Sequence, residues 1–176
     1  MRGIFNDHIA AHIMSYVLSF ARGLHIYRDL QNEKRWHSGA STVHLPEATA
    51  VIVGVGGIGS ETGRLCSEFG MKVIGVDTRL QERPSWIDEL HQPNALDDVI
   101  GQSDFLIVTV PDTPDTQGLF NRAKFGIMKK TAYFINIGRG ATSKLSDLRD
   151  SVVRTEIAGA ALDVYEEEPL PVTDQL

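Results

Sequence analysis

The sequence predicts a single domain of the α/β class, built on a doubly wound parallel β-sheet with helices on both faces. Short runs of apolar, β-branched residues alternate along the chain with segments whose apolar residues recur at helical spacing. The strand-like runs are apolar on both faces, which is typical of the buried strands of a parallel sheet. The length of 176 residues fits one domain.

The first expected element is a helix over residues 7–34, with Asn6 or Asp7 as its N-cap. Its apolar residues recur at helical spacing: Ile9, Ile13, Tyr16, Val17, Phe20 and Leu24. Residues 35–49 contain turn formers and little periodicity, which predicts a connecting loop. The later elements are predicted as strands at 51–53, 72–76, 105–110, 133–137 and 158–162, and as helices after Ser60 and near 96–100, 121–129 and 144–153.

Composition restricts the classes of partner. The chain is 42% hydrophobic and 23% charged, which is typical of a globular protein. Its formal net charge of −6 argues against a nucleic-acid partner, because phosphate backbones need a basic face. No apolar stretch is long enough to span a bilayer, so no membrane partner is expected. The single cysteine, Cys66, excludes an intrachain disulfide and, with no secretory leader, predicts a cytoplasmic location.

A glycine-rich turn follows the first expected strand. Residues 54–59, GVGGIG, fit the pattern G-x-G-x-x-G. Gly54 permits a tight turn, Gly56 lets a pyrophosphate approach the backbone, and Gly59 brings the helix close to the strand. Such a turn alone also occurs in α/β proteins without a cofactor. The strand before it and the helix after it favour a Rossmann-type dinucleotide site, because the helix N-terminus then faces the phosphates.

An acid at the end of the second expected strand supports the same site. Asp77 lies about 20 residues beyond the glycine turn, where a carboxylate accepts hydrogen bonds from the adenosine ribose. A carboxylate there repels a 2′-phosphate, which favours NAD over NADP. Arg79 is a counter-signal, because a nearby arginine accommodates that phosphate. We interpret Arg79 instead as a solvated loop residue, and we expect no metal site.

Three further stretches carry a resemblance to a known family. They are VPDTPDT at 110–116, INIGRG at 135–140 and AGAALDVYEEEPLP at 158–171. Together with VIVGVGGIGSETGRLCSEFGMKVIGVD, they resemble the D-isomer-specific 2-hydroxyacid dehydrogenases, which include phosphoglycerate, D-lactate, glyoxylate and formate dehydrogenases. The resemblance runs through nearly the whole chain. It implies an NAD-dependent oxidoreductase that interconverts a 2-oxo acid and a D-2-hydroxy acid by hydride transfer.

The resemblance also implies which residues contact the cofactor. Backbone N–H groups of Gly57 and Ile58 would face the pyrophosphate. Asp163 would hold the nicotinamide carboxamide, although a strand-end acid that caps a turn is the alternative. The other implied contacts run along the cofactor from its adenine side to its nicotinamide ribose: Val110, Pro111, Thr116, Ile137 and Gly138.

Two residues would take catalytic roles by the same resemblance. Arg139 would hold the substrate carboxylate and polarise its carbonyl through the planar guanidinium. Glu168 would orient and charge the family's histidine, which supplies a proton. From the residues alone, Arg139 would have a structural role in a Gly-Arg-Gly turn. Residues 166–168 would be a solvated acidic run.

The chain departs from the family at three places. The family's histidine lies beyond this glutamate, whereas all six histidines here precede it. The first helix resembles a crossover helix that normally follows a substrate domain, and it has Ala11 where a glutamate is usual. Residues 143–145, Ser-Lys-Leu, replace an apolar-Asp-Glu sequence, which puts the start of the next helix in doubt. We therefore expect a crossover helix and loop at 1–49 and an NAD-binding domain at 50–176, as part of an enzyme cut at both ends.

Three functions follow as hypotheses. The first is the NAD-binding domain of an oxidoreductase, nearly inactive in isolation. The second is an NAD-sensing module or corepressor-like scaffold without turnover. The third is a truncated domain with no separate function. A homodimer is also expected, because two-fold dimers are the commonest assembly and the first helix has an apolar load larger than one face needs: Ile9, Ile13, Met14, Tyr16, Val17 and Phe20.

Overall fold

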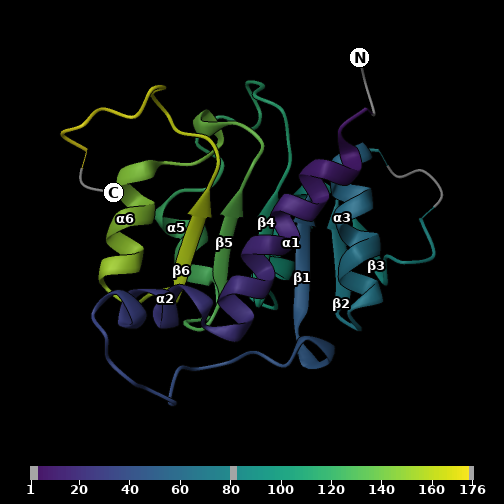
Figure 1. The fold of residues 1–176 in the computed structure, drawn as a ribbon. Coiled ribbons are helices and arrows are strands. Elements are labelled where there is room, and N and C mark those ends of the chain that lie inside the picture. Colours follow the sequence, from purple (N-terminus) through teal and green to yellow (C-terminus); the bar gives the residue numbers. More distant parts are fainter. Residues whose placement is uncertain (1–3, 80–82, 175–176) are drawn as a thin grey trace.

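Six parallel strands form one sheet with helices on both faces (Figure 1). The computed structural model describes residues 4–79 and 83–174. The strands are β1 (Thr49–Val53), β2 (Lys72–Val76), β3 (Glu89–His91), β4 (Phe105–Val108), β5 (Tyr133–Asn136) and β6 (Gly159–Leu162). Their order is β3-β2-β1-β4-β5-β6, so the chain builds one half of the sheet outward from β1 and then returns to build the other. The predicted doubly wound parallel sheet is confirmed.

Two apolar cores, one on each face of the sheet, follow from strands that are apolar on both sides. In β1, Ile52 belongs to one core and Val51 to the other, and both are fully buried. The neighbouring β4 repeats this division with Ile107 and Leu106. Burial of both faces explains why these strands appear in the sequence as continuous apolar runs.

The helices divide between the two faces. Helices α1 (Asn6–Arg22) and α3 (Gly57–Glu68) pack against each other and contribute to the first core. Helices α4 (Leu96–Ile100), α5 (Arg122–Ile127) and α6 (Leu145–Val153) contribute to the second. Ile13, Met14 and Val17 of α1 are buried in the first core. These are three of the apolar α1 residues on which the homodimer prediction rested, and they are buried in the core of the chain itself.

The expected helix over 7–34 is two helices, because the chain turns at Gly23. Gly23 has φ 64°, a left-handed conformation that favours glycine, and it ends α1. Helix α2 (Leu24–Asn32) then runs in a new direction and buries none of its residues. The apolar spacing continued through Leu24, which is 55% exposed, so periodicity alone did not reveal the break.

The N-cap prediction for the first helix was also wrong. Phe5 occupies the N-cap position, and no side chain caps the helix there. Asn6 is instead the first helical residue, and its side chain lies over Gly57 at the start of α3. Asp7 follows in the first turn, where its carboxylate accepts a hydrogen bond from the N–H of His8.

The remaining elements agree closely with the expected ones, with one addition. The strand β3 was not predicted, because its three residues are polar at both ends and only partly buried. The expected loop over 35–49 contains the short 3-10 turn η1 (Leu45–Glu47) and ends where β1 begins. Two more such turns follow, η2 (Pro93–Ala95) and η3 (Gly140–Thr142). Within the described ranges, no helix has both the length and the apolar character needed to cross a membrane.

Candidate cofactor site at the carboxyl edge of the sheet

A cavity of about 970 Å³ opens where the first strands of the sheet end. The carboxyl ends of β1, β2 and β4 contribute to it, together with the start of α3 and residues from the beginning of the chain. Its lining includes most of the residues that sequence reasoning assigned to the cofactor: Gly54, Gly56, Gly57, Ile58, Gly59, Asp77, Val110, Pro111 and Thr116. Doubly wound proteins bind ligands at this edge, where the strand order reverses and the connections from two neighbouring strands run to opposite faces of the sheet.

The glycine turn is shaped by close backbone packing. Gly54 has φ 97°, and the Oγ1 of Thr109 donates a hydrogen bond to its carbonyl at 2.6 Å. A Cβ on Gly59 would lie 1.9 Å from that same carbonyl oxygen, so only glycine fits there. A Cβ on Gly56 would meet nothing closer than an Arg79 nitrogen at 3.7 Å. The open side of Gly56 is therefore the place where a ligand phosphate can approach the backbone.

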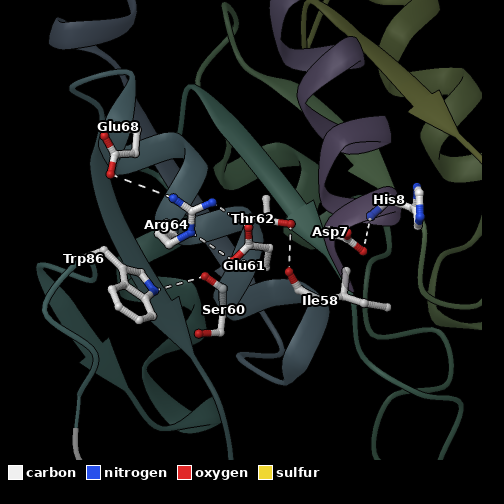
Figure 2. Close-up of polar contacts among 9 residues, drawn as sticks. All are labelled: Asp7, His8, Ile58, Ser60, Glu61, Thr62, Arg64, Glu68 and Trp86. Carbon is white, nitrogen blue, oxygen red and sulfur yellow. Dashed lines mark hydrogen bonds and ion pairs between the residues drawn. The ribbon is translucent and has the colours of Figure 1, made fainter. Parts of the chain in front are cut away.

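The start of α3 fits the phosphates of a dinucleotide. Its N-cap is Gly56, which brings no side chain to the first N–H groups of the helix. Such groups have no intrahelical partner and attract anions. On the outer side of the helix, Arg64 pairs with Glu61 at 2.7 Å and with Glu68 at 3.9 Å (Figure 2). That arginine is paired along its own helix and does not line the cavity.

Asp77 has the position predicted for the ribose acceptor, but its carboxylate already has partners. Its Oδ2 accepts the N–H of Val55 at 2.7 Å, and its Oδ1 accepts the N–H of Arg79 at 2.8 Å. The side chain is 7% exposed. Burial raises the pKa of Asp77, but the side-chain and backbone hydrogen bonds and the charge of Arg79 outweigh that effect, so the pKa is lowered from 3.8.

Arg79 is a loop residue with a side chain 61% exposed, as interpreted from the sequence, but it also has a partner that the sequence did not predict. Its Nε lies 3.0 Å from Oδ1 of Asp77 and its Nη2 lies 3.1 Å from Oδ2, which is a bidentate pair. The guanidinium also lines the cavity beside Gly56. The sequence did not predict this pair, because the side chains of residues i and i+2 point toward each other only if the backbone between them adopts a particular turn.

Farther along the same edge, Asn136 holds the turn that follows β5. Its Oδ1 accepts the N–H of Gly138 at 3.0 Å, and its Nδ2 donates to the carbonyl of Arg139 at 3.2 Å. The same amide reaches the hydroxyls of Thr142 and Ser143. Asn136 is fully buried, and sequence reasoning gave it no role. The signal was present, because a lone amide interrupts the apolar run of β5.

Arg139 and Glu168 lie on adjoining segments at this end of the site. A Cβ on Gly140 would overlap the carbonyl oxygen of Tyr165 at 1.7 Å, so the two backbones touch. The N–H of Tyr165 donates to Oε1 of Glu168 at 2.9 Å. Arg139 is exposed, and its Nη1 donates to the carbonyl of Gly138 at 2.7 Å. Neither Arg139 nor Glu168 lines the cavity.

The remaining predicted residues lie beside these two. Ile137 and Gly138 are buried in the turn after β5, and Gly138 packs against the backbone of Val110. Asp163 is exposed at the end of β6, with its Oδ1 3.6 Å from Nε2 of His12 on α1. None of the three lines the cavity, which therefore covers only the phosphate and adenosine end of the predicted site.

Asn6 is a cavity residue that sequence reasoning interpreted only as a helix cap. Its amide nitrogen would lie 2.5 Å from a Cβ on Gly57, so it sits directly on the glycine turn. Ile4, Phe5 and Ile9 extend this wall of the cavity. No local pattern could have revealed the contact, because it joins segments about 50 residues apart through the packing of α1 on α3.

Comparison with known proteins gives the same fold and the same cofactor class. The profile of the D-isomer specific 2-hydroxyacid dehydrogenase, NAD binding domain, matches residues 14–176. Glyoxylate reductase from Thermofilum pendens is 35% identical over 178 residues, covering 96% of this chain and 51% of that protein. Phosphoglycerate dehydrogenase from Lactobacillus plantarum has a TM-score of 0.92 at 31% identity, covering 99% of this chain and 56% of that one.

A third similar protein was crystallised with a cofactor. It is a D-isomer specific 2-hydroxyacid dehydrogenase from Xanthobacter autotrophicus Py2 in complex with NADPH and MES, with a TM-score of 0.90 at 29% identity. The match covers 98% of this chain and 54% of that one. The chain thus spans about half the length of these relatives. With the fold, the glycine turn and the matched profile in agreement, the chain belongs to the D-isomer-specific 2-hydroxyacid dehydrogenase family, of which it carries the NAD-binding domain.

Proposed function

We propose that this domain binds NAD(H) in the 970 Å³ cavity and serves an enzyme that interconverts a 2-oxo acid and a D-2-hydroxy acid. One observation carries the proposal. The glycine turn, Asp77 and the loop from Val110 to Thr116 converge on a single cavity at the carboxyl edge of the sheet. The proposed pyrophosphate site is the start of α3, at Gly57 and Ile58.

The proposed roles at the nicotinamide end belong to residues beyond the cavity. The bound nicotinamide supplies or accepts a hydride. Asp163 is proposed to hold the carboxamide, and Ile137 and Gly138 to pass behind the ribose. Arg139 is proposed to bind the substrate carboxylate and polarise the reacting carbonyl, since within the described residues its exposed guanidinium donates only to the Gly138 carbonyl. Glu168 is proposed to orient the proton donor of the whole enzyme.

Calorimetric titration of the 176-residue chain with NADH tests the binding step. We expect a dissociation constant in the micromolar range or weaker. Gly56→Ala is the matched variant, because among the described residues its Cβ would meet only an Arg79 nitrogen, at 3.7 Å, and it would project toward the proposed phosphate site. Weakened binding in a variant with an unchanged melting temperature is the expected result. No heat from wild type with either NADH or NAD at millimolar concentration would contradict the proposal.

We propose that Asp77 makes the site favour NAD(H) over NADP(H). Its carboxylate would accept the ribose hydroxyls in place of the Arg79 guanidinium, and hydrogen bonds to charged groups contribute about 1.5–3 kcal/mol. Asp77→Ala should therefore reduce the ratio of NADH to NADPH affinity. The ratio is measured by titrating both cofactors against wild type and variant. An unchanged ratio would show that Asp77 is not the ribose residue.

The alternative function is an NAD-sensing module without turnover. An NADH oxidation assay on the full-length protein that contains this domain distinguishes it from an enzyme. Cofactor binding with no oxidation of NADH by any 2-oxo acid would favour the binding module. Oxidation that Arg139→Ala abolishes would favour the dehydrogenase, because the proposed role of Arg139 concerns the substrate and not the cofactor.

A homodimer and a cytoplasmic location are further proposals. Trp36 is 96% exposed, and Leu24 at the start of α2 is 55% exposed. Exposed apolar surface of this kind supports a protein partner, and a second copy is the commonest one. Light scattering should give twice the chain mass, and Trp36→Ala should reduce it. The one thiol, Cys66, is buried and free, which agrees with a reducing compartment.

A further inference from the structure

We propose that His12 is a positioning residue for the nicotinamide end of the site, and that its charge sets the preference of the domain between NADH and NAD⁺. The imidazole would hold one oxygen of the Asp163 carboxylate and leave the other for the nicotinamide carboxamide. When His12 is protonated, the pair would favour the neutral, reduced ring over the cationic, oxidised one. This inference rests on the proposed cofactor binding and on the proposed role of Asp163.

The imidazole of His12 is held on a well-anchored helix. The next residue of α1, Ile13, is fully buried in the first core, and so is Val17. The ring of Tyr16, one helical turn further on, packs edge-on against that of His12, with the ring centroids 4.7 Å apart. In this position the Nε2 of His12 lies 3.6 Å from Oδ1 of Asp163, the residue that follows β6.

Asp163 has a fixed backbone and a carboxylate with one partner. Its N–H donates to the carbonyl of Asn136 at 3.0 Å, which ties the residue to the edge of the sheet. Its side chain is 54% exposed, and within the described ranges His12 is the only basic side chain that pairs with it. An ion pair through Oδ1 restricts the rotation of the carboxylate and leaves Oδ2 open to a carboxamide N–H. Ordering this group before the ligand arrives lowers the entropy cost of binding.

Other ionisable side chains lie near the pair, but they do not share the role of His12. They are His8 and Tyr16, one turn away on α1 in either direction, and Tyr165, close to Tyr16. Burial raises the pKa of Tyr16 above 10.0, and the charges of Asp163 and Tyr165 raise it further. Tyr16 therefore stays protonated between about pH 5 and 8, where histidines titrate. Among the described residues, His12 is the histidine within ion-pair distance of Asp163.

The charge of His12 discriminates between the two redox states of the cofactor. NAD⁺ carries a positive charge on its nicotinamide ring, and NADH carries none there. With His12 neutral, the Asp163 carboxylate attracts the cationic ring. With His12 protonated, the pair has no net charge and this attraction is lost. One such charge near the protein surface changes affinity by about two- to fivefold. Lowering the pH through the histidine range should therefore shift the domain toward NADH.

The experiment is a calorimetric titration of the 176-residue chain with NADH, NAD⁺ and ADP-ribose, at about pH 8 and about pH 5.5. ADP-ribose has no nicotinamide, so it reports any effect of pH on the adenosine and phosphate end alone. His12→Gln keeps an N–H donor near the position of Nε2 and is neutral at both pH values. His8→Gln is the matched control, because it makes the same change at an exposed position one turn earlier on α1 (Figure 2).

In wild type, the ratio of NADH to NAD⁺ affinity should rise by about two- to fivefold between the higher and the lower pH. The rise should be the same in His8→Gln and absent in His12→Gln and in Asp163→Asn. His12→Ala should also weaken NADH by about threefold or more relative to ADP-ribose, because Asp163 is no longer held. His12→Gln should restore part of that loss, which a purely structural role of the side chain does not predict.

The remaining outcomes contradict the inference. A ratio that is constant in wild type, or that rises equally in His12→Gln, overturns it and leaves the cofactor site intact. Loss of the rise in His8→Gln as well assigns the effect to the general charge of α1 and also overturns it. If wild type binds neither ADP-ribose nor NADH, the proposed function fails and this inference fails with it. Melting temperatures of all variants establish that the effects do not come from unfolding.

Discussion

Two glycines of one turn have different physical roles, although the sequence motif treats them alike. Gly59 is required by packing, since a Cβ there would overlap the Gly54 carbonyl, whereas Gly56 faces an open cavity. The same distinction applies to Asp77 and Arg79. Asp77 is 7% exposed and accepts a backbone N–H from Val55, whereas the Arg79 side chain is 61% exposed and pairs with the Asp77 carboxylate.

Gly59→Ala is expected to destabilise the domain by about 3 kcal/mol or more, because backbone atoms cannot move away as a flexible side chain would. Gly56→Ala should change stability by less than about 1 kcal/mol, since its Cβ meets only an ordinary contact. Urea unfolding of both variants measures the difference. Similar losses in both would show that the close approach of Gly59 to Gly54 is not present in solution.

The lowered pKa of Asp77 predicts a pH dependence of stability. A carboxyl whose folded pKa is depressed below its unfolded value stabilises the folded state above that unfolded value, near 3.8. The contribution is lost as the pH falls from about 4 through the lower folded pKa. Asp77→Asn should therefore flatten the acid limb of the unfolding free energy below about pH 4. An acid limb as steep as that of wild type would contradict the ion pair with Arg79.

At the scale of the elements, helix α6 has no N-terminal cap from its own sequence, and a side chain distant in the sequence caps it instead. Ser143 and Lys144 replace the residues usual there, and the N-cap Lys144 provides no side-chain cap. Glu166 supplies it instead: its Oε2 accepts the N–H of Leu145 at 2.7 Å. Residues 166–168 are therefore not simply a solvated acidic run.

Glu166→Ala should destabilise the domain by about 1 kcal/mol, the usual contribution of an N-terminal cap. Glu167→Ala is the control, because Glu167 is the adjacent exposed glutamate with the same charge. Thermal unfolding at equal ionic strength compares the two. If Glu167→Ala lowers the melting temperature as much as Glu166→Ala, net charge and not the cap is responsible.

At the scale of the whole molecule, the site is a row of segments along one sheet edge. The cavity proposed for the adenosine and phosphates lies over β1, β2 and β4, and Arg139, Asp163 and Glu168 follow over β5 and β6. Substrate reduction also needs a positioned proton donor. Among the described residues, Glu168 accepts a hydrogen bond only from the backbone of Tyr165, and no histidine contacts it.

A polypeptide of these 176 residues is therefore expected to oxidise NADH at close to the background rate. A positioned acid contributes about 10²–10⁴-fold, and a guanidinium is a poor proton donor. The assay follows NADH absorbance with pyruvate, glyoxylate or hydroxypyruvate. Robust oxidation that Arg139→Ala removes would require another acid in this chain, and His12, 3.6 Å from Asp163, would be the first residue to substitute.

Much of this fold was predictable because its signals are local. Continuous apolar runs define the strands β1, β2, β4 and β5, and the glycine turn with Asp77 predicts the proposed phosphate and ribose positions. Each depends on neighbours in the chain, and the order of the elements restricts a parallel α/β sheet to few topologies. The roles of Arg139, Asp163 and Glu168 came from family resemblance alone, since in isolation each would be an ordinary turn residue.

Other features depended on contacts between distant segments. The pairing of β3 with β2, the contact of Asn6 with Gly57 and the capping of α6 by Glu166 each join residues that are far apart in the sequence. The pairing of Arg79 with Asp77 depends on the geometry of a single turn, which composition does not encode. Tertiary packing decides such contacts, because a side chain's partner is fixed by the position of the backbone that carries it.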